Sequence, residues 1–281
     1  MKNLMKIKNI FMIEKIEDIK STSQWNDIIT DKLKIKIEDI NNYDDFIDKK
    51  NETFDEILNI PEWKDAKWLE NVNINNINVN NKIKTLISKI KYIYIAKNKM
   101  NEMYVDGFMD SLLHILGFDD YPCLLYPQYE YFANIGRSDH GIIAKTDFSV
   151  ITEKNKVLII IEDKTMNNAS YSNNWKEDQI LGELFVAVHN IVSNGKVTNY
   201  PLCIYGIRVV GTLFTFYKTE VGTDYIKETA KKIPINNEMK VLRYPPVEDN
   251  PSKLTAYDIC NIHERNEIIK CMISIKIDIS S

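Results

Sequence analysis

The chain has 281 residues, of which 44% are hydrophobic and 27% charged, an ordinary composition for a globular protein. This hydrophobic fraction excludes a wholly disordered chain. The formal net charge of −4 argues against broad, nonspecific phosphate binding, because such binding depends on many Lys and Arg side chains. It does not exclude a local nucleic-acid site, since a bound divalent cation contributes positive charge of its own.

Cysteine spacing and hydropathy exclude further classes of protein. The four cysteines show neither CxxC nor Cys/His spacing, so the sequence predicts no zinc site and no disulfide framework. The N-terminal segment lacks the continuous apolar run of a signal peptide. The most apolar stretch, at 201–217, contains Arg208 and two glycines and therefore predicts no membrane span. We expect an intracellular protein of the nucleus or cytoplasm, with no membrane partner.

Two regions are expected along the chain. Residues 1–82 predict an accessory, mainly helical region, with a helix-like piece at 43–58 and an Asn-rich linker at 71–82. Residues 83–281 predict the second domain. It begins with apolar residues that recur at helical spacing over 103–116 and stop at Gly117, as in a helix with a glycine C-cap.

The remaining elements of the second domain alternate in type. Runs rich in β-branched and aromatic residues predict strands, and apolar residues at helical spacing predict helices. Three strands are expected at 126–135, 140–152 and 156–165, a helix at 176–193, two strands at 201–211 and 212–221, and helices near 224–232 and 254–272. This order describes an α/β fold in which helices flank a mixed sheet.

Three residues near the ends of adjacent strands carry the predicted chemistry. The run at 157–161 is apolar at both parities, which indicates a central strand covered on both faces, and it ends in Glu162-Asp163-Lys164. Glu162 and Lys164 share a face because side chains two apart on a strand point the same way. Asp147 lies one hairpin earlier, so its carboxylate and that of Glu162 can meet. Two close carboxylates repel one another and favour a hard divalent cation.

This D…ExK pattern across a hairpin resembles the PD-(D/E)XK nuclease superfamily over roughly residues 100–217. The resemblance implies a restriction-endonuclease-like αβββαβ core. It implies that Asp147, Glu162 and the backbone carbonyl of Asp163 bind Mg²⁺ or Mn²⁺, and that Lys164 assists the attacking water. The segments KTDFSVI, IIIEDK, EDQILGEL and IRVVGTLFTFYK are also similar to nuclease-like domains of Crinkler-type effectors and related fungal proteins.

The resemblance extends to two helices and departs from the family at one residue. Thr146 stands where the family pattern has proline, which makes the motif less specific. Many superfamily members have a glutamine beside the active site, which implies a catalytic role for Gln179. Their first helix often supplies a glutamate to the metal site, which implies the same for Glu102. Glu130 is the fallback for that glutamate.

The other polar candidates have simpler interpretations as well. Gln179 can equally be a solvated helix residue, and Glu183 is expected at the surface. Arg208 is a candidate for phosphate contact. His189 is expected to be a satisfied core or boundary residue rather than a metal ligand. The aromatic run from Tyr126 to Phe132 can stack bases, although sheet packing is the commoner use.

Three functions follow from this pattern. The first is a Mg²⁺- or Mn²⁺-dependent nuclease, for which DNA is favoured over RNA as the substrate, that leaves a 5′-phosphate and a 3′-hydroxyl. The second is a catalytically inactive member of the same fold that binds nucleic acid or protein, against which the intact Asp147, Glu162 and Lys164 argue. The third is an unrelated α/β interaction protein in which Glu162 and Lys164 form a structural ion pair at the end of a sheet.

Overall fold

The computed structural model describes residues 19–47, 58, 60–96, 102–135, 141–154, 156–163, 177–195, 200–233, 236–247 and 256–281. For Glu102 and for residues 160–163 it describes the backbone alone. Lys164 lies outside the described residues. Within the described part of the chain, no helix is both long enough and apolar enough to cross a lipid bilayer.

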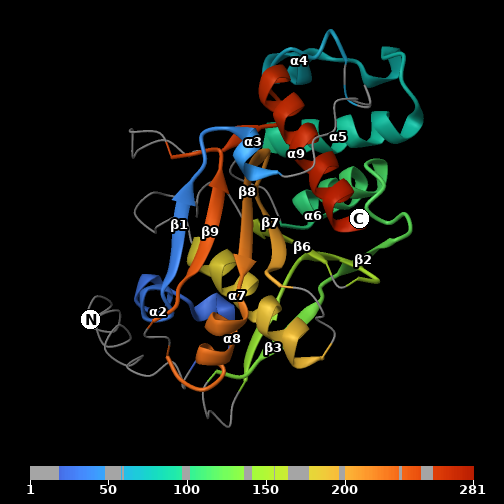
Figure 1. Cartoon of the computed structure of the whole chain (residues 1–281). Helices are drawn as coiled ribbons and strands as arrows, with labels where there is room; N and C mark the ends of the chain where they lie inside the picture. Colours follow the sequence, from blue (N-terminus) through green and yellow to red (C-terminus); the bar gives the residue numbers. More distant parts are fainter. Residues whose placement is uncertain are drawn as a thin grey trace, which may run out of the picture.

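A large mixed sheet forms the centre of the molecule (Figure 1). Its main strands follow one another in the order β1-β9-β8-β7-β6-β5-β2. The short β10 pairs with the N-terminal end of β8. Their bounds are β1 Ile35–Asp39, β2 Cys123–Pro127, β5 Phe148–Thr152, β6 Val157–Asp163, β7 Leu202–Val210, β8 Leu213–Val221, β9 Met239–Tyr244 and β10 Tyr257–Asp258. The expected class, an α/β fold with helices flanking a mixed sheet, is confirmed.

β6 occupies the interior position that its apolar run predicts. It pairs antiparallel with β5 on one side and parallel with β7 on the other. Val157, Leu158 and Ile159 are at most 1% exposed, because helices cover both faces of the sheet. Two parallel neighbours need a crossover connection, which here contains α7 (Glu177–Ser193).

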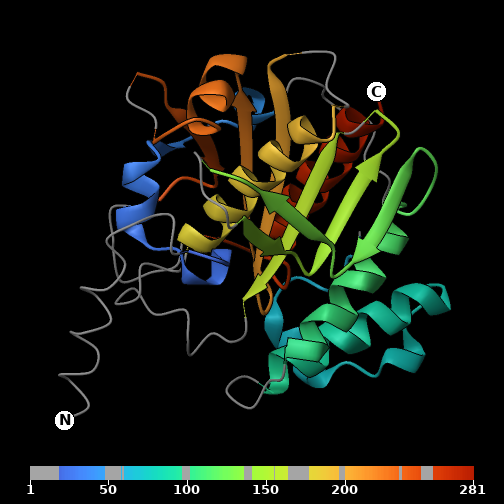
Figure 2. The ribbon, with the colours of Figure 1, turned by 90° about the horizontal axis from the view of Figure 1, so that it is seen from below.

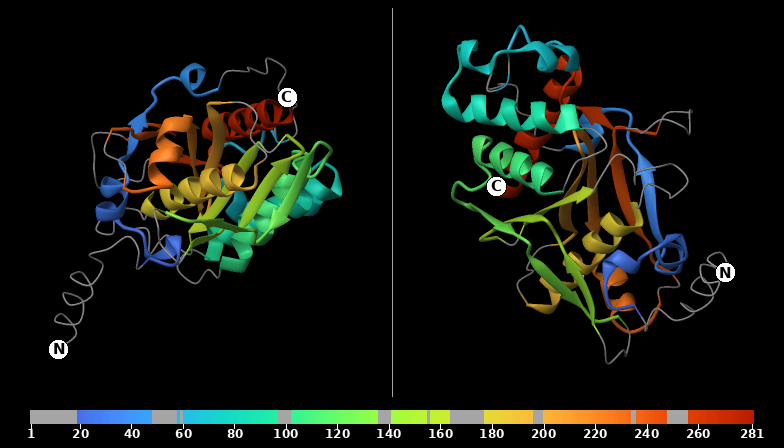
Figure 3. Two further views of the ribbon diagram at one scale, coloured as in Figure 1. Left: turned by 60° about the horizontal axis from the view of Figure 1, so that its bottom comes forward. Right: turned by 180° about the vertical axis from the view of Figure 1, so that it is seen from behind.

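Helices cover the two faces of the sheet and form two apolar cores. The helices α5 (Asn81–Ala96), α6 (Glu102–Ile115) and α9 (Ile262–Ser280) share one core with one face. The helices α2 (Asp27–Lys32), α7 and α8 (Thr223–Thr229) share the other. Figure 3, right, shows α5, α6 and α9 gathered at one end of the molecule.

Glycines end both long helices that the sequence predicts. Gly117 follows α6 with a φ of 73°, and Gly195 follows α7 with a φ of 67°. An L-residue avoids this left-handed conformation, whereas glycine adopts it without strain. The predictions for 103–116 and 176–193 are therefore confirmed within one residue at each end.

Five strands lie between α6 and α7, where three were expected. The first expected run divides into β2 and β3 (Glu130–Ala133), and the second into β4 (Ile142–Lys145) and β5. β3 and β4 form a separate two-stranded sheet that leaves the main sheet and packs on α7. Figure 2 shows this pair, in green, lying over the yellow α7.

The C-terminal helix begins later than its apolar pattern predicts. It was expected at 254–272, whereas α9 runs over Ile262–Ser280. Asn261 caps it by accepting hydrogen bonds from the backbone N–H groups of His263 and Glu264. The turn before Asn261 follows β10, which pairs with β8.

The N-terminal region contributes to the same sheet. β1 pairs in parallel with β9, with Ile35 opposite Met239, and the sequence does not predict this strand. The helix expected at 43–58 is described only as the short α3 (Tyr43–Phe46). Helix α4 (Ala66–Asn71) and the 3₁₀ turn η3 (Ile74–Asn76) precede α5. A domain boundary at residue 82 stays a prediction.

Candidate functional site

Asp147 lies at the corner of a bent hairpin. At this corner the hairpin leaves the main sheet, where β2 pairs with β5, and becomes the pair β3–β4. The N–H of Gln128 donates to the carbonyl of Asp147 at 2.8 Å, and the N–H of Thr146 donates to the carbonyl of Tyr129 at 3.0 Å. Gln128 has a φ of 52°, which turns the outer strand at the same point. Both strands therefore bend together beside Asp147.

The corner lies beside the C-terminal end of β6. Phe148, which follows Asp147, is opposite Ile160, and β6 runs on for three more residues to Asp163. On the other side Glu162 is opposite Val209 and Asp163 is opposite Val210. The backbones of Asp147 and of the Glu162-Asp163 pair thus lie at one end of the sheet. The side chains of Glu162 and Asp163, and all of Lys164, fall outside what the structure describes.

Buried hydroxyl groups hold the corner in place. The hydroxyl oxygens of Thr146 and Ser149 are 2.8 Å apart, and the hydroxyl of Tyr131 donates to Ser149 at 3.0 Å. Thr146 also donates to the carbonyl of Tyr129. All three hydroxyl-bearing residues are at most 1% exposed. Thr146, where the family pattern has proline, therefore contributes hydrogen bonds that proline cannot make.

Helix α7 adds a polar pair, the half-buried Gln179 and the buried Glu183, beside these hydroxyls. The Nε2 of Gln179 donates to Oε1 of Glu183 at 3.0 Å, one turn along the helix. Burial raises the pKa of the Tyr131 hydroxyl, and the negative charge of Glu183 adds to that rise. The surface position expected for Glu183 is wrong, because its side chain is 0% exposed. The β3–β4 pair covers the face of α7 that would otherwise meet solvent.

Charged side chains also meet at the start of α7. Arg243 donates to both oxygens of Glu177 at 2.8 and 2.7 Å and to both oxygens of Asp39 at 2.7 and 3.0 Å. The hydroxyl of Tyr217 donates to Glu177 at 2.8 Å. This network connects β1, β8, β9 and α7. No sequence pattern predicts it, because its members are far apart along the chain.

Arg208 is a buried cation on β7. It is 6% exposed and lies on β7 opposite Ile161, one residue before Glu162. Burial and the charge of Glu177 raise the pKa of Tyr217, and the positive charge of Arg208 opposes this rise. Arg208 therefore lies within electrostatic reach of the first turn of α7. Its phosphate contact stays a prediction.

Of the other candidate residues, the structure describes the side chains of some and not of others. α6 begins at Glu102 and packs against β6, but the side chain of Glu102 is outside the description. Glu130 is exposed on β3, opposite Lys145. His189 is 3% exposed, and its Nε2 lies 2.9 Å from the hydroxyl oxygen of Thr229. The interpretation of His189 as a satisfied core residue is confirmed.

The structure describes part of the chain's set of metal-ligating side chains. Among those residues, no group of three His, Cys, Asp or Glu side chains could hold a metal ion. The structure does not describe the side chains of Glu162, Asp163 and Glu102, which complete the expected set of ligands. No protein-family model matches the chain, and no curated protein matches it.

Proposed function

We propose that the chain is a metal-dependent nuclease of the PD-(D/E)XK type that acts on DNA. One observation carries the proposal: the hairpin corner at Asp147 lies beside the end of β6, where Glu162 and Lys164 follow in the sequence. The order α6, β2, β5, β6, α7, β7 supports a restriction-endonuclease-like core, with the β3–β4 pair as an excursion of the hairpin. The Crinkler-type relationship is part of the same proposal.

The proposed metal ligands are oxygen atoms, which suits Mg²⁺ or Mn²⁺. Asp147, Glu162 and the backbone carbonyl of Asp163 would hold the ion, with Glu102 as a further ligand. When bound, the ion lowers the pKa of a coordinated water and offsets charge on the phosphate.

The protein's own groups would carry the reaction. Lys164 holds the attacking water in line with the scissile bond, and Gln179 orients it from α7. The water oxygen would bond to phosphorus and give up one proton to solvent while the bond from phosphorus to O3′ breaks. The leaving oxygen takes up a proton, which gives a 5′-phosphate and a 3′-hydroxyl.

The hydroxyl cluster and α7 support this site by keeping it rigid. Asp147 is flanked by Thr146 and Phe148, which are fixed by the Ser149 hydrogen bond and by the β5–β6 ladder. The hydrogen-bonded pair of Gln179 and Glu183 adjoins the same cluster. Catalytic groups need such support, because a small misplacement of a reacting group costs orders of magnitude in rate.

The test is cleavage by the purified protein. Plasmid, single-stranded DNA and RNA are incubated with Mg²⁺, Mn²⁺ or EDTA, and products are separated on gels and end-mapped. Asp147→Asn and Lys164→Ala should each reduce cleavage by more than about 100-fold, since each removes several kcal/mol of transition-state stabilisation. Asp110→Asn is the matched control, because that carboxylate is 51% exposed on α6.

The outcomes separate the competing functions. Metal-dependent cleavage that survives Asp147→Asn or Lys164→Ala would overturn the residue assignment. Absence of cleavage, together with retained nucleic-acid binding in a gel-shift assay, would favour the inactive binding module. Absence of both would favour an interaction protein in which Glu162 and Lys164 pair structurally. Thermal unfolding of each variant checks that it folds.

A further inference from the structure

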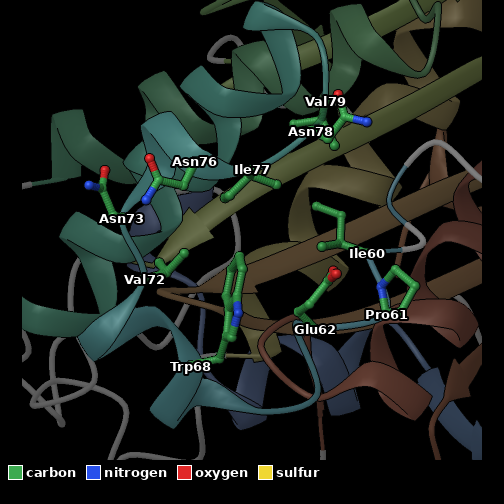
Figure 4. A pocket seen from close by; sticks show the side chains of 10 residues that line it. All are labelled: Ile60, Pro61, Glu62, Trp68, Val72, Asn73, Asn76, Ile77, Asn78 and Val79. Atoms are coloured by element: carbon green, nitrogen blue, oxygen red, sulfur yellow. The ribbon is translucent and has the colours of Figure 1, made fainter.

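A pocket of about 460 Å³ opens beside α4, and its lining shares no residue with the candidate site (Figure 4). Its volume is within the range of about 300–1,000 Å³ found for small-molecule sites. Apolar and polar side chains both line it. The apolar ones are Ile60, Pro61, Trp68, Val72, Ile77 and Val79, and the polar ones are Glu62, Asn73, Asn76 and Asn78.

An aromatic stack fixes the position of Trp68 in the pocket wall. The rings of Trp63 and Trp68 are stacked, with centroids 5.7 Å apart and an interplanar angle of 17°. Trp63 is fully buried, and the guanidinium of Arg265 lies 3.9 Å from its ring centroid. Arg265 also donates to the carbonyls of Trp63 and Ile259. The half-buried Trp68 therefore presents a rigid aromatic surface to the pocket.

The polar part of the lining can recognise hydrogen-bonding edges. The carboxylate of Glu62 reaches into the same pocket as the Trp68 ring (Figure 4). Asn73, Asn76 and Asn78 also line the pocket, and their side-chain amides carry both donors and acceptors. An aromatic surface with donors and acceptors at its border suits a flat heterocycle with a polar edge. Nucleobases are ligands of this kind, and they stack on aromatic side chains.

We propose that this pocket binds one unpaired purine base, and guanine in preference to adenine. Guanine presents two adjacent N–H donors, at N1 and at the 2-amino group, to a carboxylate such as that of Glu62. Adenine presents a lone pair at N1, which a carboxylate repels. Base pairing occupies this edge of guanine, so the pocket takes a base from a single strand or one turned out of a duplex.

Backbone hydrogen bonds link the segment that follows Glu62 to the start of α9, and the turn before α9 to the turn between β7 and β8. The carbonyl of Lys64 accepts from Ile262, and the N–H of Ile259 donates to Thr212 at 3.0 Å. Thr212 is in the turn after β7, two residues beyond Val210, which is opposite Asp163. A base in the pocket would thus anchor a strand that continues toward the proposed nuclease site. This use of the pocket rests on the proposed function, whereas base binding itself does not.

Isothermal titration calorimetry of the full chain with nucleoside monophosphates tests the proposal. Guanosine, adenosine and uridine 5′-monophosphates are titrated in EDTA, so binding is measured without metal and without cleavage. We expect the guanine nucleotide to bind at least about tenfold tighter than the uridine nucleotide, as one stronger stacking and edge contact would give. Equal binding of all three, or binding of none, would overturn the proposal.

Variants locate the binding in the pocket. Trp68→Leu should weaken guanine-nucleotide binding by about tenfold, the effect of losing one stacked ring. Glu62→Gln, a substitution at an exposed position, should reduce the preference for guanine over adenine. Tyr121→Leu is the control, because that ring is 77% exposed and lies outside the pocket. Unchanged affinity in both pocket variants would overturn the site. Inactivity on nucleic acid with retained nucleotide binding would overturn the nuclease proposal alone.

Discussion

His189 makes the folding stability depend on pH in a defined window. The imidazole is 3% exposed in α7, lies 4.4 Å from the Phe185 ring, and meets the hydroxyl of Thr229 through Nε2. Burial lowers the pKa of His189 to about 4, against about 6.5 for an ordinary histidine. The folded protein therefore keeps the ring neutral at pH values where the unfolded chain takes up a proton.

The sign and the size of the effect follow from this difference in pKa. Because the folded-state pKa is the lower one, stability is complete above pH 6.5 and falls as the pH decreases toward 4. The free energy of unfolding should decrease by about 2 kcal/mol at pH 5 and by about 3 kcal/mol below pH 4 through this group alone. At neutral pH the group has no such effect.

Urea denaturation followed by circular dichroism measures this contribution at pH 7 and pH 5. His189→Leu loses the Thr229 contact and should be less stable than wild type at pH 7. Its stability should fall by about 2 kcal/mol less than that of wild type between the two pH values. His114→Gln, at a side chain 51% exposed, is the control and should follow wild type. Equal losses in wild type and His189→Leu would refute the reasoning.

Two further substitutions test the packing around α7. Gly182→Ala would put a Cβ 2.6 Å from the ring of Trp25 and should cost about 1–3 kcal/mol of unfolding free energy in urea. Gly222→Ala, with no atom within 4 Å of the new Cβ, is its control, and equal midpoints would contradict the contact. Arg243→Met should cost about 2–3 kcal/mol, because it leaves the partly buried network at the start of α7 without its cation. Lys240→Met removes an exposed pair and should cost clearly less than Arg243→Met, so similar losses would contradict this ranking.

Elements with a strong local signal could be predicted from the sequence. α6 and α7 have apolar residues at helical spacing and a glycine just beyond the last turn. The run at 157–161 has apolar residues at both parities, and β6 is indeed an interior strand. The hairpin that brings Asp147 toward β6 follows from two neighbouring strand-like runs. In each of these cases the relevant residues are adjacent in the chain.

The division of the hairpin into two sheets could not be predicted. The run at 140–152 has strand-forming residues throughout, and nothing in its composition marks Thr146-Asp147 as a corner. The corner depends on Gln128, whose positive φ turns the opposite strand, and on hydroxyl contacts among Thr146, Ser149 and Tyr131. The sequence does not predict β1 for a similar reason. Each residue of β1 pairs with a residue of β9 that lies 204 positions later in the chain.

Glu183 shows how this missed corner changed the interpretation of the candidate site. A polar pair one turn apart on a helix usually lies on a solvated face, which is why the surface position was expected. α7, however, is packed between the main sheet and the β3–β4 pair, so its residues from Ile180 to His189 are all buried. A carboxylate in such a position is costly unless other groups compensate it. The bend that places Asp147 at the end of β6 also encloses Glu183, so one feature of the backbone determines the surroundings of both carboxylates.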